Sequence, residues 1–208
     1  MKILKKVGVR EVKRTFVISN NIRIQKNGRR YLGKISKEEF LKKFQQSKRK
    51  GVRMTDKQLD RQVSRSWLRR LRAYDSSNWY IGEVKTSEVG VWKKAGDLPL
   101  SWTNGSLKKT ADKVREALEK DSKKFVRRAR RAVSNMLVTN VDLLQSEKYL
   151  LPIIFKGGTG TLGRRGLKRG MKGDIDDGSM RSIALAVHGA RTIRAYIGFP
   201  KKERGTLK

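Results

Sequence analysis

The chain has 208 residues, with 52 Lys and Arg against 19 Asp and Glu, and so carries a formal net charge of +33. So many cations repel one another in a compact fold, and we expect a polyanion, by default nucleic acid, to neutralise them. The absence of cysteine excludes disulfide bonds, thiol catalysis and thiolate zinc sites. The chain also has no unbroken apolar segment of about 18 residues, the length that a membrane-spanning helix needs, so we expect no membrane partner.

Residues 1–35 are predicted to form strands, because β-favouring residues recur there. The pair Asn27-Gly28 is the preferred pair for a tight hairpin turn. Lys26, Arg29 and Arg30 flank this turn, so its tip is cationic. The tip either reaches into nucleic acid or is a solvated turn, and the residues do not decide between the two.

Two helices are predicted next, each opened by a capping box. The first begins after Ser36 and runs to Gly51, and the second follows Thr55 and continues to Tyr74, with Trp67 on its core face. The stretch 75–102 is irregular apart from a short strand at Trp79-Tyr80-Ile81. We therefore predict a basic N-terminal module over residues 1–100, with this stretch as linker, and a second part over 101–208.

The second part is organised around a long amphipathic helix, predicted from Ser106 to Leu137. Its apolar residues, from Leu107 to Met136, recur with a helical period. Its last third is crowded with cations, more than the negative end of a helix dipole requires. These cations are candidate contacts with an anionic surface: Lys120, Lys123, Lys124, Arg127, Arg128, Arg130 and Arg131.

A short helix and a buried strand are predicted between Val138 and Phe155. The following stretch, residues 156–173, is rich in glycine, and ordering such a backbone is costly, about 1–2 kcal/mol per residue. We expect it to be a mobile arm that becomes ordered against nucleic acid or an acidic protein. The cations of this arm are Lys156, Arg164, Arg165, Lys168, Arg169 and Lys172. Its Gly158–Gly163 segment formally matches a dinucleotide-binding fingerprint, but no apolar-periodic helix follows, so we reject that function.

The C-terminal stretch is predicted to contain a turn and a hairpin. Asp174, Asp176 and Asp177 lack the remaining ligands of a calcium loop, and a turn that compensates the arm's charge is the better interpretation. Residues 183–187 and 193–199 alternate between apolar and polar side chains, as paired strands do. The predicted fold is therefore α+β: a long helix packed on a small antiparallel sheet, preceded by a basic hairpin-plus-helices module.

The residues offer little for catalysis. The single histidine, His188, is placed at a strand end without an evident catalytic partner, and no spacing of acids suggests a metal site. We expect no enzymatic activity, no cofactor and no metal.

The second half carries a resemblance to a known family. Asp177-Gly178-Ser179-Met180-Arg181-Ser182-Ile183 follows the glycine-rich arm, and a later segment ends in Ala195-Tyr196-Ile197-Gly198-Phe199-Pro200. Over about residues 101–200 this resembles the tail-completion and virion-morphogenesis proteins of tailed bacteriophages. Those proteins carry a Thr/Ser-Gly-x-Leu motif that leads into a Ser-Ile strand, and a later strand that ends in an Ile-Gly or Val-Gly step. Here Asp177 replaces the hydroxyl residue and Met180 replaces the leucine.

The resemblance implies a structural subunit of a phage virion. Such proteins form a ring at the head-tail neck, so a homo-oligomer is implied, with the arm reaching a neighbouring subunit or the DNA in the channel. The alternative is an RNA- or DNA-binding protein of the ribosomal-protein type, which acts through phosphate contacts. Both functions explain the net charge, but only the virion role explains the pattern of the second half, and only the binding protein explains a charge of +33 without a further assumption. Phosphate contacts do not separate RNA from DNA.

Overall fold

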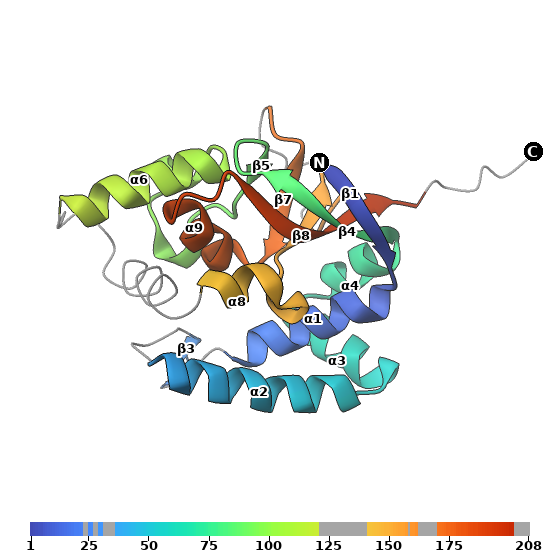
Figure 1. Ribbon diagram of the computed structural model, residues 1–208. Coiled ribbons are helices and arrows are strands. Elements are labelled where there is room, and N and C mark those ends of the chain that lie inside the picture. Colours follow the sequence, from blue (N-terminus) through green and yellow to red (C-terminus); the bar gives the residue numbers. More distant parts are fainter. Residues whose placement is uncertain are drawn as a thin grey trace, which may run out of the picture.

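Figure 1 shows the computed structural model, which describes residues 1–22, 25–26, 29–30, 36–120, 141–157, 159–161 and 170–201. Within these ranges six strands form one sheet in the order β1-β4-β8-β6-β7-β5. The strands are β1 (Lys2–Val7), β4 (Ser77–Lys85), β5 (Val89–Gly90), β6 (Ile153–Lys156), β7 (Gly173–Asp177) and β8 (Thr192–Pro200). Helices accompany this sheet, so the predicted α+β class is confirmed.

The sheet is mixed, and the predicted purely antiparallel sheet is wrong. β6 pairs in parallel with β8, and β5 pairs in parallel with β7. The reason lies in helix α9 (Ser179–Val187), which connects β7 to β8 and carries the chain past β6 to its other side. β4 pairs with β8 from Ser77↔Pro200 to Lys85↔Thr192, so one sheet combines strands from both sides of the predicted boundary near residue 100.

The two faces of the sheet carry separate hydrophobic clusters. Along β6, Ile153 and Phe155 belong to one cluster and Ile154 to the other, because successive side chains of a strand point to opposite faces. The first cluster adds residues of α1 (Val9–Asn21), α3 (Asp56–Ser66) and α4 (Leu68–Asp75). The second adds residues of α6 (Leu107–Glu119) and α9, and also of α2 (Lys37–Arg53) and α8 (Val141–Ser146).

The N-terminal prediction is half wrong. Lys2–Val7 is a strand, but Val9–Asn21 forms α1. The β-branched residues of this stretch favour strands, but Val12 and Phe16 lie one helical turn apart and are both buried, so packing overrides the local preference. β2 (Gln25–Lys26) pairs antiparallel with β3 (Arg29–Arg30), which confirms the predicted hairpin.

The next helices begin as predicted. The Ser36 hydroxyl accepts the Glu39 N–H at 3.1 Å, and Thr55 and Gln58 form the full capping box. The predicted continuous helix up to Tyr74 is wrong, because the backbone of Trp67 is extended and separates α3 from α4. The stretch that follows contains β4, β5, the 3-10 turn η1 (Ala95–Asp97) and the short helix α5 (Leu100–Thr103).

In the second half, Ser106 caps α6 as predicted, with its hydroxyl accepting the Lys109 N–H at 3.2 Å. Residues 121–137 of the predicted long helix lie outside the described residues. The predicted short helix and buried strand are confirmed as α8 and β6, joined by the 3-10 turn η2 (Lys148–Leu150). The predicted strand 183–187 is wrong: these residues belong to α9, and β8 has no hairpin partner there. Ile183 through Ala186 are all buried, so α9 lacks the polar face that identifies a surface helix.

Asp176 and Asp177 form buried ion pairs, and the predicted turn is wrong, because these residues lie in strand β7. Asp176 accepts hydrogen bonds from Arg70 Nε at 2.8 Å and from the Tyr74 hydroxyl at 2.9 Å. Asp177 accepts from Arg181 at 2.9 Å, and the Ser19 hydroxyl donates to it at 3.0 Å. Aspartate alone favours turns, but these partners stabilise Asp176 and Asp177 in strand β7 and connect that strand to α1, α4 and α9.

Candidate anion-binding pocket

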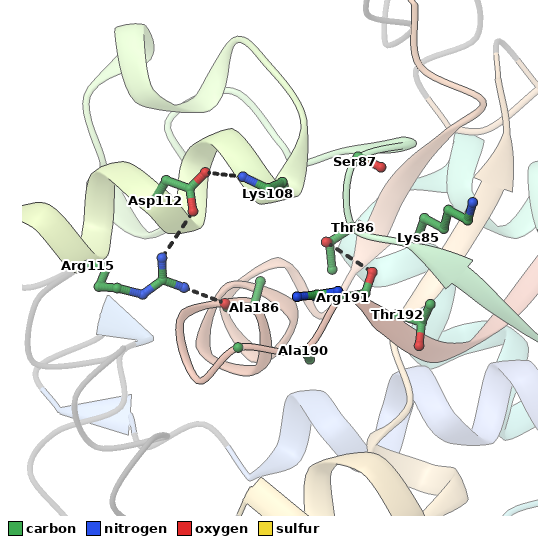
Figure 2. A pocket seen from close by; sticks show the side chains of 11 residues that line it. Lys85, Thr86, Ser87, Lys108, Asp112, Arg115, Ala186, Ala190, Arg191 and Thr192 are labelled. Carbon is green, nitrogen blue, oxygen red and sulfur yellow. Dashed lines mark hydrogen bonds and ion pairs between the residues drawn. The ribbon is translucent and has the colours of Figure 1, made fainter.

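A cavity of about 510 Å³ opens where α6, the end of β4 and the start of β8 meet. Figure 2 shows Lys108, Asp112 and Arg115 of α6 on one side, Lys85, Thr86 and Thr192 on the other, and Arg191 between them. The described residues that line the cavity are Lys85, Thr86, Ser87, Lys108, Asp112, Arg115, Ala186, Gly189, Ala190, Arg191 and Thr192.

Backbone hydrogen bonds hold the three segments together. Lys85 and Thr192 form the last residue pair of β4 and β8. Just beyond it, the Thr86 N–H donates to the Arg191 carbonyl at 2.9 Å, and the Thr86 carbonyl accepts the Lys108 N–H at 2.9 Å. Thr86 therefore connects the first turn of α6 to the start of β8, and it fixes the distance between the two walls of the pocket.

Small residues leave the space between these walls open. Ala186, Gly189 and Ala190 line the pocket at the end of α9. Gly189 has a φ of +99°, a left-handed conformation that glycine adopts without steric cost, and it lets the chain turn from α9 towards β8.

Among the described residues that line the pocket, Asp112 supplies the one carboxylate, and two cations pair with it. Asp112 pairs with Lys108 at 2.8 Å and with Arg115 at 3.1 Å. Hydrogen bonds from Lys108 and then Arg115 lower the pKa of Asp112, so it is ionised at neutral pH. Arg115 also donates to the carbonyls of Ala186 at 3.0 Å and Val187 at 3.1 Å, which caps the end of α9.

Lys85 and Arg191 are exposed, and neither makes an ion pair with another described residue. The described part of the lining has four cations and one carboxylate, and so a surplus of three positive charges. Exposed hydroxyls of Ser87 and Thr192 lie on the same rim. Guanidinium, ammonium and hydroxyl donors together suit an anion with several oxygens, such as a phosphate group.

The predicted residues whose side chains the structure describes lie outside the pocket. Lys120 pairs with Glu116, Lys172 pairs with Glu88 at 2.8 Å, and Lys156 lies over the Phe199 ring. None of these three lines the pocket. Lys26, Arg29 and Arg30 lie in the two strands of the hairpin. The remaining predicted cations, Lys123, Lys124, Arg127, Arg128, Arg130, Arg131, Arg164, Arg165, Lys168 and Arg169, lie outside the described residues.

Sequence reasoning missed every cation of the pocket. Lys85 and Arg191 are distant in the chain and become neighbours only through the register of β4 and β8. Arg191-Thr192 directly precedes the strand predicted at 193–199, but Lys85-Thr86 lies four residues beyond the strand predicted at Trp79-Tyr80-Ile81, so nothing in the sequence indicates that the two pairs meet.

The described ranges contain neither a candidate metal site nor a helix that could span a membrane. No group of three or more His, Cys, Asp or Glu side chains there is placed to hold a metal ion. His188 is exposed and follows α9 as its C-terminal cap, so its predicted place at a strand end is wrong. None of the described helices has the length and apolar character needed to cross a bilayer.

Comparison with known proteins does not further constrain the function of the pocket. No protein-family model, curated protein or solved structure matches this chain.

Proposed function

We propose that this protein is a non-enzymatic binder of nucleic acid that contacts the phosphate backbone. The observation that supports the proposal most strongly is the pocket, where Lys85 and Arg191 face a cavity without an acidic partner among the described residues. A phosphate group would supply the missing negative charge and accept hydrogen bonds from both walls.

A polyanion fits better than a single small anion because of the total charge. One phosphate in the pocket would leave most of the net charge of +33 uncompensated. A nucleic acid presents one negative charge per about 1.7 Å of duplex, so it neutralises the pocket and the surrounding surface together. Both RNA and DNA carry this backbone, and the proposal covers both.

The proposal is tested by fluorescence anisotropy with labelled duplex DNA and single-stranded RNA over a range of salt concentrations. We expect the logarithm of the association constant to fall linearly with the logarithm of salt concentration. We also expect the double variant Lys85→Gln/Arg191→Gln to bind more weakly and with a shallower slope. An affinity that stays constant between low and physiological salt would overturn the proposal.

We further propose that the protein has a structural role in the neck of a tailed-phage virion, as a subunit of a homo-oligomer, and that it binds nucleic acid there. The observation in its favour is β8, a strand that contains the Ile197-Gly198 step of the resemblance, although it continues beyond that step to Pro200. The expected Ser182-Ile183 strand is part of helix α9 instead.

Light scattering coupled to size-exclusion chromatography at high salt tests this setting separately. A ring subunit is expected to elute as a discrete oligomer, alone or with acidic virion subunits. A protein that remains monomeric at all concentrations, with and without such subunits, would contradict the virion role and leave nucleic-acid binding intact.

A further inference from the structure

A second cationic surface lies on the N-terminal helices, remote from the pocket in sequence. α2 and α3 both pack on α1, and Figure 1 shows them on the far side of α1 from the sheet. Phe40, Phe44 and Gly51 bury one side of α2, and Leu59 and Val63 bury one side of α3. The opposite sides of both helices are therefore turned to solvent.

The outward sides carry cations at helical spacing. Lys42, Arg49 and Arg53 of α2 are seven and four residues apart, and they return to one side of a helix with 3.6 residues per turn. Lys57, Arg61 and Arg65 of α3 are spaced by four residues and do the same. All six are exposed, and we name this set the basic face: Lys42, Arg49, Arg53, Lys57, Arg61 and Arg65.

Most nearby acids are committed to other cations. Asp60 and Asp75 both pair with Lys13, whose side chain is only 8% exposed. Burial lowers the pKa of Lys13, but hydrogen bonds to these two carboxylates outweigh that effect and raise it. Asp56 pairs with Arg10, and Glu39 pairs with Lys43. These pairs neutralise cations outside the basic face, and no cation of the face has an ion-pair partner in the described part of the chain.

We infer that the basic face is a second nucleic-acid contact, on which a phosphate backbone lies along α2 and α3. This inference rests on the proposed function and extends it from one pocket to an extended surface. The three cations of α2 span about 16 Å and those of α3 about 12 Å at the helical rise of 1.5 Å per residue. Duplex phosphates are dense enough to meet such a row at any register, whereas an acidic protein would need carboxylates at matching positions.

The experiment neutralises each row separately. The α2 variant is Lys42→Gln/Arg49→Gln/Arg53→Gln, and the α3 variant is Lys57→Gln/Arg61→Gln/Arg65→Gln. Glutamine has nearly the helix propensity of lysine and arginine, so both variants are expected to fold. The matched control is Lys2→Gln/Lys5→Gln/Lys6→Gln on β1, whose side chains are also exposed. Each triple removes three positive charges and so lowers the net charge from +33 to +30.

Salt titrations with duplex DNA and with single-stranded RNA measure the outcome. On duplex DNA we expect each helix variant to make the salt slope shallower by about 2–3, since one phosphate contact contributes about 0.9. The control is expected to keep the wild-type slope. Helix variants that match the control on both nucleic acids, while the wild type remains salt-dependent, overturn this inference alone. A wild type without salt dependence overturns the proposed function as well.

Discussion

The buried ion pairs of β7 and the open pocket beside α6 use the same residue types in opposite ways. At β7, the Asp176 side chain is 2% exposed and Arg70 is 12% exposed, so this ion pair is nearly removed from water. Arg181 and Asp177 form a second buried pair. In the pocket, Lys85 and Arg191 are exposed and have no acidic partner among the described residues.

The difference separates the cations that the fold needs from those that it does not. A buried arginine without a carboxylate would be strongly unfavourable, so each cation in the β7 cluster is matched by an acid. Burial disfavours the charged form of Arg70, yet the charge of Asp176 outweighs this and raises the pKa of Arg70. An exposed cation has no such requirement, because water solvates it, and it is free to bind an anion from outside the chain.

The largest expected effect comes from breaking a buried pair. Asp176→Asn leaves the Arg70 guanidinium buried without a negative charge and weakens the hydrogen bond from Tyr74. We expect the free energy of unfolding to fall by about 3–5 kcal/mol, measured by urea denaturation. The control is Asp56→Asn, which removes the exposed partner of Arg10 and is expected to cost less than about 1 kcal/mol. Equal effects of the two substitutions would contradict the contrast between buried and exposed pairs.

The second expected effect is a loss of stability at alkaline pH. Burial, followed by the charge of Asp176, raises the pKa of Tyr74 well above its ordinary value of 10.0. Between that value and its folded pKa, Tyr74 keeps its proton only in the folded protein. Stability is therefore complete below pH 10.0 and falls above it, by up to about 1.4 kcal/mol per pH unit for one such group.

Tyr74→Phe isolates this contribution. Lys13 and Tyr196 also have raised pKa values, so the variant should still lose stability above pH 10, but less steeply than the wild type. Urea denaturation at pH 9, 10 and 11 measures the two slopes. Identical slopes would show that the Tyr74 hydroxyl ionises equally in the folded and unfolded chains.

Local features of the fold could be predicted from the sequence, and features that depend on distant partners could not. The caps at Ser36, Thr55 and Ser106 depend on residues three positions away, and all three are confirmed. For residues 183–187 the sequence predicts a strand, whereas the structure has helix α9. These residues are buried on more than one side of the helix, and that burial depends on contacts with α6 and the sheet, which a local pattern does not show.

The candidate site shows the same division. The residue counts correctly predict a surplus of cations, but they do not predict where in the fold these cations lie. Lys85 and Arg191 meet only because β4 and β8 pair in one register, and Arg115 approaches them because α6 packs on α9. A run of cations, as in the predicted arm, is easily recognised in a sequence. Four separate cations that the fold brings together from α6 and from the ends of β4 and β8 are not.

A smaller effect is expected from the acid inside the pocket. Asp112→Asn removes the carboxylate that competes with a bound anion for Lys108 and Arg115. Because these pairs are exposed, we expect nucleic acid to bind about two- to fivefold more tightly, with little change in stability. Glu119→Gln makes the same charge change on α6 outside the pocket and serves as control. Weaker binding by Asp112→Asn alone would mean that Asp112 positions the two cations for the ligand.

The smallest expected effect is the change in binding affinity when the base sequence of the nucleic acid is changed. Contacts to phosphate carry no sequence information, and specificity requires hydrogen bonds to base edges in a groove. The pocket and the basic face attract a backbone by charge, so scrambling a duplex of fixed length should change its affinity by less than about twofold. Competition between scrambled duplexes in the anisotropy assay measures this ratio at one salt concentration. A preference above about tenfold, or about 1.4 kcal/mol, would require direct contacts to bases, and the exposed cations would then position the protein for a reading element elsewhere in the chain.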